Sequence, residues 1–147
     1  MIQPDRAARF LAELDAALAG AADPPTVAMQ LIAKSFSHYQ WVGIYWLAGH
    51  TLTLGPFVGK PTEHTQIAVG QGVCGTAIAQ GKNQLIADVR EVANYLACST
   101  TTRAEIVVLI HHASEVIGQI DADSDAVGAF DASDEALLNA VAARLGR

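Results

Sequence analysis

Cys74 and Cys98 are the only cysteines in the 147-residue chain, and both lie among small residues rather than in an apolar run. Cys74 falls within the glycine-rich residues 69–77, and Cys98 follows Leu96 and Ala97. A structural cysteine more often sits in a strand or helix core, as a small hydrophobic side chain. At a turn or a helix start, outward-pointing N–H groups favour the thiolate instead. This placement predicts thiol chemistry on a small molecule, although two unrelated thiols fit the count equally well.

Three acidic residues are candidates for proton transfer. Asp121 and Asp123 are two residues apart in a strand-like run, so both carboxyls point to one face of the strand. Glu105 opens the preceding strand-like run and is expected across from them. Carboxyls inside a sheet resist ionisation, so one of them would keep a proton near neutral pH and act as a general acid. The pattern alone slightly favours the alternative, an exposed face that carries ordinary carboxylates.

Two aromatic residues are candidates for a pocket wall. Trp41 and Tyr45 are four residues apart in a strand-like run and therefore share a face. Such residues are more often part of a core. Because aromatic residues make up only 6% of the chain, we also expect this pair to wall a small binding site.

Neither a metal nor a nucleotide cofactor is predicted. The histidines and cysteines show no Cys-x-x-Cys or His-x-x-x-His spacing, and His111 and His112 fall at a strand end, where exposure is usual. The glycines of residues 70–75 match G-x-G-x-x-G, but the helix that follows is too short for a dinucleotide-binding unit. We expect these glycines to form a tight turn into the helix that carries Cys74.

The composition indicates one globular domain spanning residues 1–147. Hydrophobic residues make up 51% and charged residues 16%, and the net charge is −6. The nine Lys and Arg residues are scattered, which disfavours a nucleic-acid partner. No apolar run is long enough to cross a membrane, so no membrane association is expected. Two cysteines without an export signal favour a reducing, cytoplasmic location.

The predicted order of elements is two helices, an antiparallel meander with a helical excursion, and a closing helix. Helices are expected over residues 4–19, from 23 to 36, over 73–80, and from a cap at Asp131 or Ser133 to the C-terminus. Strands are expected at 41–47, 51–54, 67–69, 85–87, 105–110 and 116–123, with a long loop over 55–66. This predicts an α+β fold with helices against one face of the sheet. The Ala- and Leu-rich first helix is compatible with a homodimer.

Seven motifs in order resemble the GAF-domain free methionine-(R)-sulfoxide reductase family over roughly residues 40–142. They are WVGIY at 41–45, LGPFVGKP at 54–61, VGQGVCGTA at 69–77, ADV at 87–89, AC at 97–98, EIVV at 105–108 and IDADS at 120–124. The resemblance implies a GAF-like antiparallel sheet, with the N- and C-terminal helices packed on one face and a ligand pocket on the other.

The resemblance also implies the chemistry. The cysteine that matches Cys98 would attack the sulfoxide sulfur and become a sulfenic acid as methionine leaves. The matching carboxyls would hold the substrate and help to protonate its oxygen, and the matching aromatic residues would wall the pocket; these are Glu105, Asp121, Asp123, Trp41 and Tyr45. The free amino acid would be the substrate, and thioredoxin would reduce the resulting disulfide.

The chain departs from the family pattern after Gly-Lys-Pro. Family members usually carry a further, resolving cysteine there, whereas this chain has Pro61-Thr-Glu-His-Thr65. Either Cys74 resolves the sulfenic acid on Cys98, or an external thiol such as thioredoxin does so directly. The missing cysteine also leaves a rival function open, namely a non-catalytic GAF sensor that binds a small ligand in the same cavity.

Overall fold

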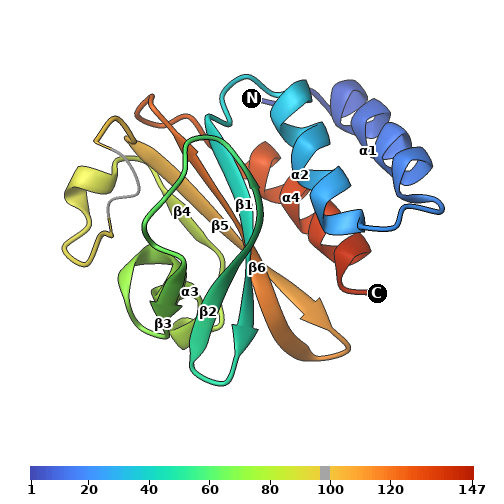
Figure 1. The fold of residues 1–147 in the computed structure, drawn as a ribbon. Helices are drawn as coiled ribbons and strands as arrows, with labels where there is room; N and C mark the ends of the chain where they lie inside the picture. The colour runs from blue at the N-terminus through green and yellow to red at the C-terminus, as the bar shows by residue number, and fades with distance from the viewer. Residues whose placement is uncertain (97–99) are drawn as a thin grey trace.

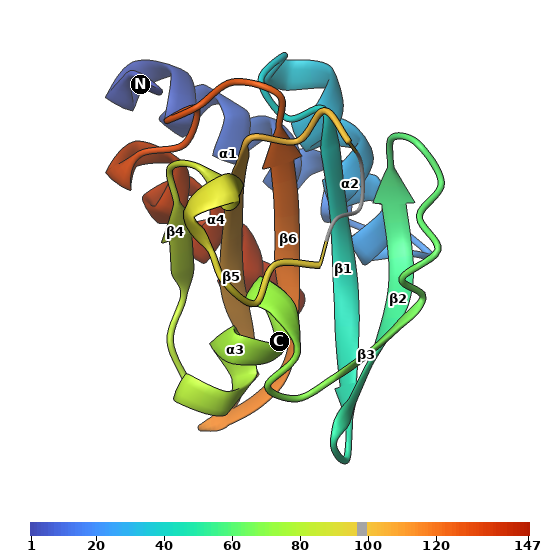
Figure 2. The same ribbon diagram turned by 90° about the vertical axis from the view of Figure 1, so that its left-hand side faces the viewer.

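A computed structural model of the protein describes residues 1–96 and 100–147, and it contains a six-stranded sheet with helices on both sides (Figures 1 and 2). The strands follow the order β3-β2-β1-β6-β5-β4, and every neighbouring pair is antiparallel. The strands are β1 (Trp41–Ala48), β2 (Thr51–Val58), β3 (Gln66–Ala68), β4 (Gln84–Ile86), β5 (Ala104–His112) and β6 (Glu115–Ser124). The helices are α1 (Pro4–Leu18), α2 (Pro24–Ser35), α3 (Gly72–Gln80), the 3₁₀ turn η1 (Val89–Glu91) and α4 (Ala132–Leu145).

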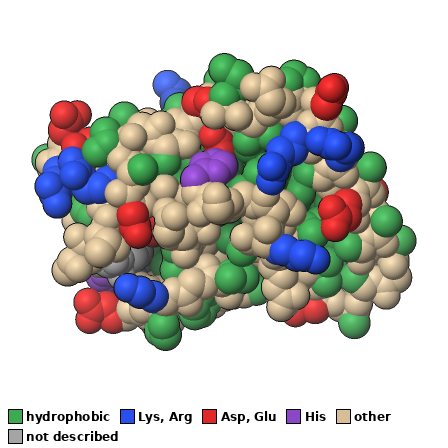
Figure 3. Space-filling model, turned by 90° about the horizontal axis from the view of Figure 1, so that it is seen from above, with side chains coloured by type: hydrophobic (Ala, Val, Ile, Leu, Met, Phe, Trp, Pro, Cys, Tyr) green, Lys and Arg blue, Asp and Glu red, His purple; other side chains and the backbone are tan. Residues whose placement is uncertain are grey.

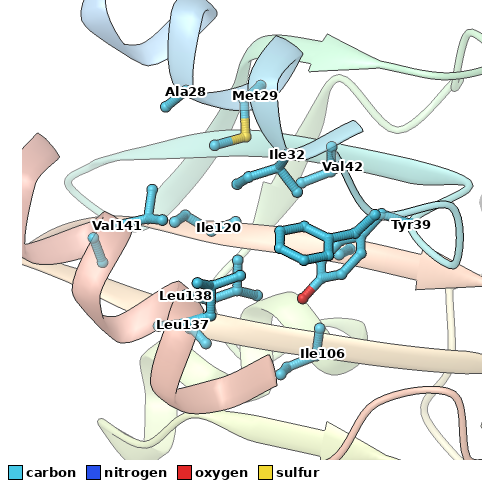
Figure 4. Close-up of a cluster of buried hydrophobic side chains, with 14 of the residues drawn as sticks. Ala28, Met29, Ile32, Tyr39, Val42, Ile106, Ile120, Leu137, Leu138 and Val141 are labelled. Carbon is cyan, nitrogen blue, oxygen red and sulfur yellow. The ribbon is translucent and has the colours of Figure 1, made fainter. Parts of the chain in front are cut away.

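One face of the sheet packs against α1, α2 and α4 (Figure 1). Alternate residues of the central strands point to this side and meet the apolar faces of α2 and α4, as Figure 4 shows. The apolar stripe of α1 is buried here through Phe10 and Leu14. The residues labelled in the close-up are Ala28, Met29, Ile32, Tyr39, Val42, Ile106, Ile120, Leu137, Leu138 and Val141. The expected placement of the terminal helices on one face is confirmed.

The other face carries a second buried cluster, and α3 lies over this face of the sheet, as Figure 2 shows. Because side chains alternate along a strand, the same central strands supply both clusters. Trp41 and Tyr45 of β1 and Val107 and Leu109 of β5 belong to this second cluster, together with α3 residues that include Cys74. Both faces of the central strands are therefore buried, and those expected site residues that the structure describes lie on the face opposite the terminal helices.

The prediction for residues 55–58 was wrong, because β2 continues to Val58 instead of giving way to a loop at Gly55. Phe57 pairs with Gly43 and Val58 pairs with Val42, and the register shifts between Gly43 and Tyr45. This irregularity accommodates Pro56, which has no N–H group to donate to a ladder. The long loop thus begins at Gly59. The other predicted elements agree with the structure within about two residues, a usual margin for boundaries.

The described helices and one face of the surface bear on the expectations about a membrane and about nucleic acid. None of the described helices combines the length and the hydrophobicity needed to cross a bilayer. On the face shown in Figure 3, acidic and basic side chains are interspersed with apolar and uncharged ones and form no continuous basic patch.

Candidate active site

The register of the sheet brings the predicted acidic and aromatic residues together. Asp123 of β6 pairs with Trp41 of β1 on one side and with Glu105 of β5 on the other. Two residues earlier on the same face of β6, Asp121 pairs with Gly43 of β1. The hairpin of β5 and β6 and the sequence-distant strand β1 therefore place these side chains in one cluster, as the alternation of side chains along paired strands requires.

The acidic cluster is buried, so the alternative of an exposed face with ordinary carboxylates is wrong. Asp121 is completely buried, and Glu105 and Asp123 are each 3% exposed. The carboxylate oxygens of Asp123 accept no hydrogen bond from any described residue. Those of Asp121 make none of good geometry with the described chain either, although Glu105 and Cys74 lie beside them. Unpartnered polar atoms at this depth are rare, which makes these carboxyls candidates for a functional site.

Burial shifts the acids toward their protonated forms. Desolvation raises the pKa of the Asp121 carboxyl, and the polar groups of Glu105 and Cys74 beside it offset part of the rise. For Asp123, desolvation and then the charges of Asp121 and Asp125 raise the pKa well above its ordinary value. A carboxyl that keeps its proton in a closed pocket is a suitable general acid.

Cys74 lies in the first turn of α3 and points toward the acids. Its Sγ donates to Oε2 of Glu105 over 3.8 Å, and the side chain is 5% exposed. One ligand-type atom from each of Cys74, Glu105 and Asp121 lies within 4.8 Å of the others. Gln119 of β6 is completely buried and donates from Nε2 to the Cys74 carbonyl over 3.0 Å, which fixes the start of α3 against the sheet.

The glycines form the expected turn into α3. Gly70 and Gly72 have φ values of +90° and +63°, which L side chains rarely adopt. Gly75 allows a close approach instead, since a Cβ there would lie 2.5 Å from the carbonyl oxygen of Ala68. The turn is closed by a hydrogen bond from Gly70 N to Gly75 O of 2.8 Å. The prediction that these glycines form a tight turn into the helix that carries Cys74 is confirmed.

Trp41 and Tyr45 share the predicted face and hold the loop that follows β2. The Trp41 indole donates to the Lys60 carbonyl over 3.1 Å, and the Tyr45 hydroxyl donates to the His64 carbonyl over 2.8 Å. The loop in which family members were expected to carry a further cysteine is thus fixed to two buried aromatic side chains. The geometry of that loop depends directly on this face of the sheet.

Gly43 provides the space that the Trp41 indole occupies. A Cβ on Gly43 would lie 2.6 Å from Cη2 of Trp41 and 2.7 Å from Cβ of Phe57. With only hydrogens at this position, Trp41 stacks on Phe57 with ring centroids 5.5 Å apart and an interplanar angle of 16°. The aromatic wall therefore depends on a glycine in the strand as well as on the aromatic residues themselves.

A cavity of about 140 Å³ opens beside this wall. Trp41, Asp123, Lys60 and Asp125 are among the residues that line it. It lies on the face predicted to hold a ligand pocket, and it is bounded by both charged and apolar groups, as small-molecule sites usually are. The remaining described residues that line it are Gln40, Thr101 and Thr102.

Cys98, the predicted nucleophile, lies outside the described residues, as does Ala97 of the same motif. Its role and its pairing with Cys74 therefore stay predictions. Three described residues of this region were not predicted from the sequence as site residues: Gln119, and Lys60 and Asp125 of the cavity lining. Gln119 could have been predicted from the sequence, because it is two residues before Asp121 and therefore lies on the same face of β6. Lys60 and Asp125 come together at the cavity only through the tertiary fold, so the sequence carries no signal for them.

Comparison with known proteins assigns the chain to a family. The GAF domain profile matches residues 26–147. The chain is 38% identical over 115 residues to the free methionine-R-sulfoxide reductase of Escherichia coli, which covers 78% of this chain and 69% of that protein. It belongs to the GAF domain family and, within it, to the family of the free methionine-R-sulfoxide reductases.

Solved structures agree with this assignment. The free methionine-R-sulfoxide reductase of Neisseria meningitidis, solved in complex with its substrate, superposes with a TM-score of 0.89 at 32% identity, over 98% of this chain and 90% of that one. The type II free methionine-R-sulfoxide reductase of Thermoplasma acidophilum gives a TM-score of 0.80 at 38% identity, over 82% and 86% of the two chains. The α+β, GAF-like fold is thereby confirmed.

Proposed function

We propose that this chain is an enzyme that reduces free methionine-R-sulfoxide to methionine. The observation that carries the proposal is the buried cluster of Glu105, Asp121 and Asp123 beside the aromatic wall, in a chain similar to reductases named for this substrate. A sulfoxide offers a polar oxygen and an apolar methyl group, and the cluster and the wall match these two parts.

The carboxyls protonate the sulfoxide oxygen. Because burial raises the pKa values of Asp121 and Asp123, the cluster retains a proton that it can donate as negative charge develops on that oxygen. Donating the proton leaves a carboxylate in the buried cluster. Glu105 lies beside Asp121 and shares in holding the polar end of the substrate.

Cys98 acts as the nucleophile. Its sulfur bonds to the substrate sulfur, the protonated oxygen passes to Cys98, and methionine leaves with the electron pair on its own sulfur. Cys98 is then a sulfenic acid, so the substrate has been reduced and the cysteine oxidised by two electrons. The Cys74 thiolate next attacks the Cys98 sulfur, which releases water and forms a disulfide. A dithiol, thioredoxin in this proposal, returns both cysteines to thiols.

The pocket selects the free amino acid. Trp41 lines the cavity, and Trp41 and Tyr45 tie down the loop at Lys60 and His64, so that the cavity measures only about 140 Å³, a size that suits a small molecule better than a polypeptide chain. We accordingly propose rejection of peptide-bound sulfoxide. We expect the enzyme to work in a reducing cytoplasm and without a cofactor. That the protein forms a homodimer stays a prediction.

The test supplies the pure R and S epimers of free methionine sulfoxide, and a peptide that contains the R epimer, to the reduced protein with dithiothreitol. Methionine should form from the free R epimer, and the other two substrates should react far more slowly. The Cys98→Ser variant, which keeps the shape of the side chain, should bind the free R epimer but release no methionine. Equal activity of this variant would remove Cys98 from the mechanism. Binding without turnover by the parent protein would favour the sensor function instead.

A further inference from the structure

We propose that the reduced protein binds a zinc ion through Cys74 Sγ and the carboxylates of Glu105 and Asp121, and that the bound ion blocks the pocket. The three ligand atoms come from α3, β5 and β6 and lie within 4.8 Å of one another. The candidate ligands are separated by 31 residues between Cys74 and Glu105, so no short metal-binding motif marks the site in the sequence. The fold assembles it.

The spacing of the ligand atoms suits a small cation. Zinc–sulfur bonds of about 2.3 Å and zinc–oxygen bonds of about 2.0–2.2 Å place tetrahedral ligands roughly 3.4–3.6 Å apart. The distance from Cys74 Sγ to Glu105 Oε2 is 3.8 Å, and all three atoms already lie within 4.8 Å. Movements of about 1 Å or less, available from side-chain rotation, complete the set without a change in the backbone.

A second observation points independently to a cationic ligand. Both carboxylate oxygens of Asp121 are fully buried and lack a hydrogen bond of good geometry from the described chain, and so does Oε1 of Gln119, two residues away on the same face. These are acceptor atoms, and an ion would satisfy them directly or through its bound water. A void of about 10 Å³, close to the volume that holds one water molecule, borders Cys74 and Glu105.

The donor set favours zinc over the common hard cations. A thiolate is a soft ligand that Mg²⁺ and Ca²⁺ avoid, whereas zinc accepts sulfur and carboxylate oxygen together. On binding, the Cys74 thiol and the proton-carrying carboxyl of the cluster lose their protons to solvent, and the zinc–sulfur and zinc–oxygen bonds form; no electrons are transferred. Three protein ligands leave a fourth position for water.

The consequence for turnover rests on the proposed function. The ion would occupy the carboxyls that we assign to the sulfoxide oxygen, and it would remove Cys74 as the resolving thiol. Zinc should therefore inhibit competitively with free methionine-R-sulfoxide, and a chelator should restore activity. The binding itself does not depend on the enzyme assignment and is measured separately.

The test titrates the reduced, metal-free protein with Co²⁺ alone, which takes zinc sites and reports a thiolate ligand by charge-transfer absorption. One equivalent should produce this absorption, and Zn²⁺ should abolish it by displacement. Cys74→Ser should lose the absorption, and Asp121→Asn should bind at least about tenfold more weakly. Cys98→Ser should keep the absorption, as should Glu115→Gln, an exposed control at the other end of β6.

Other outcomes overturn the proposal. Absence of the cobalt–thiolate absorption in the parent protein would refute it, and so would its persistence in Cys74→Ser or its loss in Cys98→Ser. Thermal unfolding of each variant without metal shows whether it is folded, and added Zn²⁺ should raise the unfolding temperature of the parent but not of Cys74→Ser. If metal binds as described while no methionine forms from the sulfoxide, the proposed function fails and the metal site stands.

Discussion

Replacing Asp123 by asparagine should make the protein more stable at neutral and alkaline pH while impairing its activity. Asp123 is 3% exposed, and its two oxygens are buried without hydrogen bonds from the described residues. Desolvation, with the charges of Asp121 and Asp125, raises its pKa well above the ordinary value. Asparagine has nearly the same shape and cannot ionise, so it removes this cost and leaves the packing in place.

The sign of the pH dependence follows from proton linkage. Between the ordinary pKa of about 3.9 in the unfolded chain and the raised pKa in the folded chain, the folded state holds a proton that the unfolded state has lost. The contribution of this proton to the free energy of unfolding is therefore fully present below the pKa of the unfolded chain. It is lost as the pH rises through the pKa of the folded chain. Each such proton contributes a slope of at most about 1.4 kcal/mol per pH unit.

The assay is denaturant unfolding, followed by tryptophan fluorescence, of the parent and the Asp123→Asn variant at several pH values between about 5 and 8. The free energy of unfolding of the variant, relative to the parent, should increase with pH at up to the slope above. Glu115→Gln removes an exposed carboxylate from the same strand and should show no such trend. Parallel curves for Asp123→Asn and the parent across the whole range would refute the reasoning.

Three further substitutions test the structural roles assigned to residues in β1 and at the start of α4. Gly43→Ala should destabilise the protein by about 1–3 kcal/mol in urea unfolding and raise KM, because its Cβ meets Trp41 Cη2 at 2.6 Å. Tyr45→Phe removes the hydrogen bond to the His64 carbonyl and should raise KM with a loss of about 1 kcal/mol in the same assay. Asp131→Ala removes the capping box of α4 and should cost about 1 kcal/mol without changing KM. Unchanged kinetics in the first two variants, or a raised KM in the third, would contradict this assignment of roles.

The sequence predicted most elements because their signals are local. Alternation placed Asp121 and Asp123 on one face, and the glycine turn before Cys74 was readable from the residue types that allow a positive φ. The extension of β2 was missed because Gly55 and Pro56 resemble loop residues, and only pairing with β1 makes the segment a strand. Such pairing is a tertiary interaction that overrides local preference.

Burial was the property that the sequence could not decide. Whether the acids of β6 face water or the interior depends on what covers their face of the sheet. Alternation shows that the acids share a face, but only the fold shows that α3 packs on that face. The closeness of Cys74 to Glu105 depends on the same packing. Sequence spacing therefore gave no indication that Cys74, Glu105 and Asp121 form one cluster, although each was a candidate site residue.

The most direct test of the central claim is a single turnover without reductant. The fully reduced protein is mixed with excess free methionine-R-sulfoxide, and both the methionine formed and the mass of the protein are measured. The proposal predicts one methionine per chain and a protein that has lost two hydrogens, with a disulfide that joins the peptides containing Cys74 and Cys98. A protein that forms no methionine and keeps its mass, while its thiols are reduced and its fold is intact, would contradict the claim that this GAF domain is a thiol-based reductase.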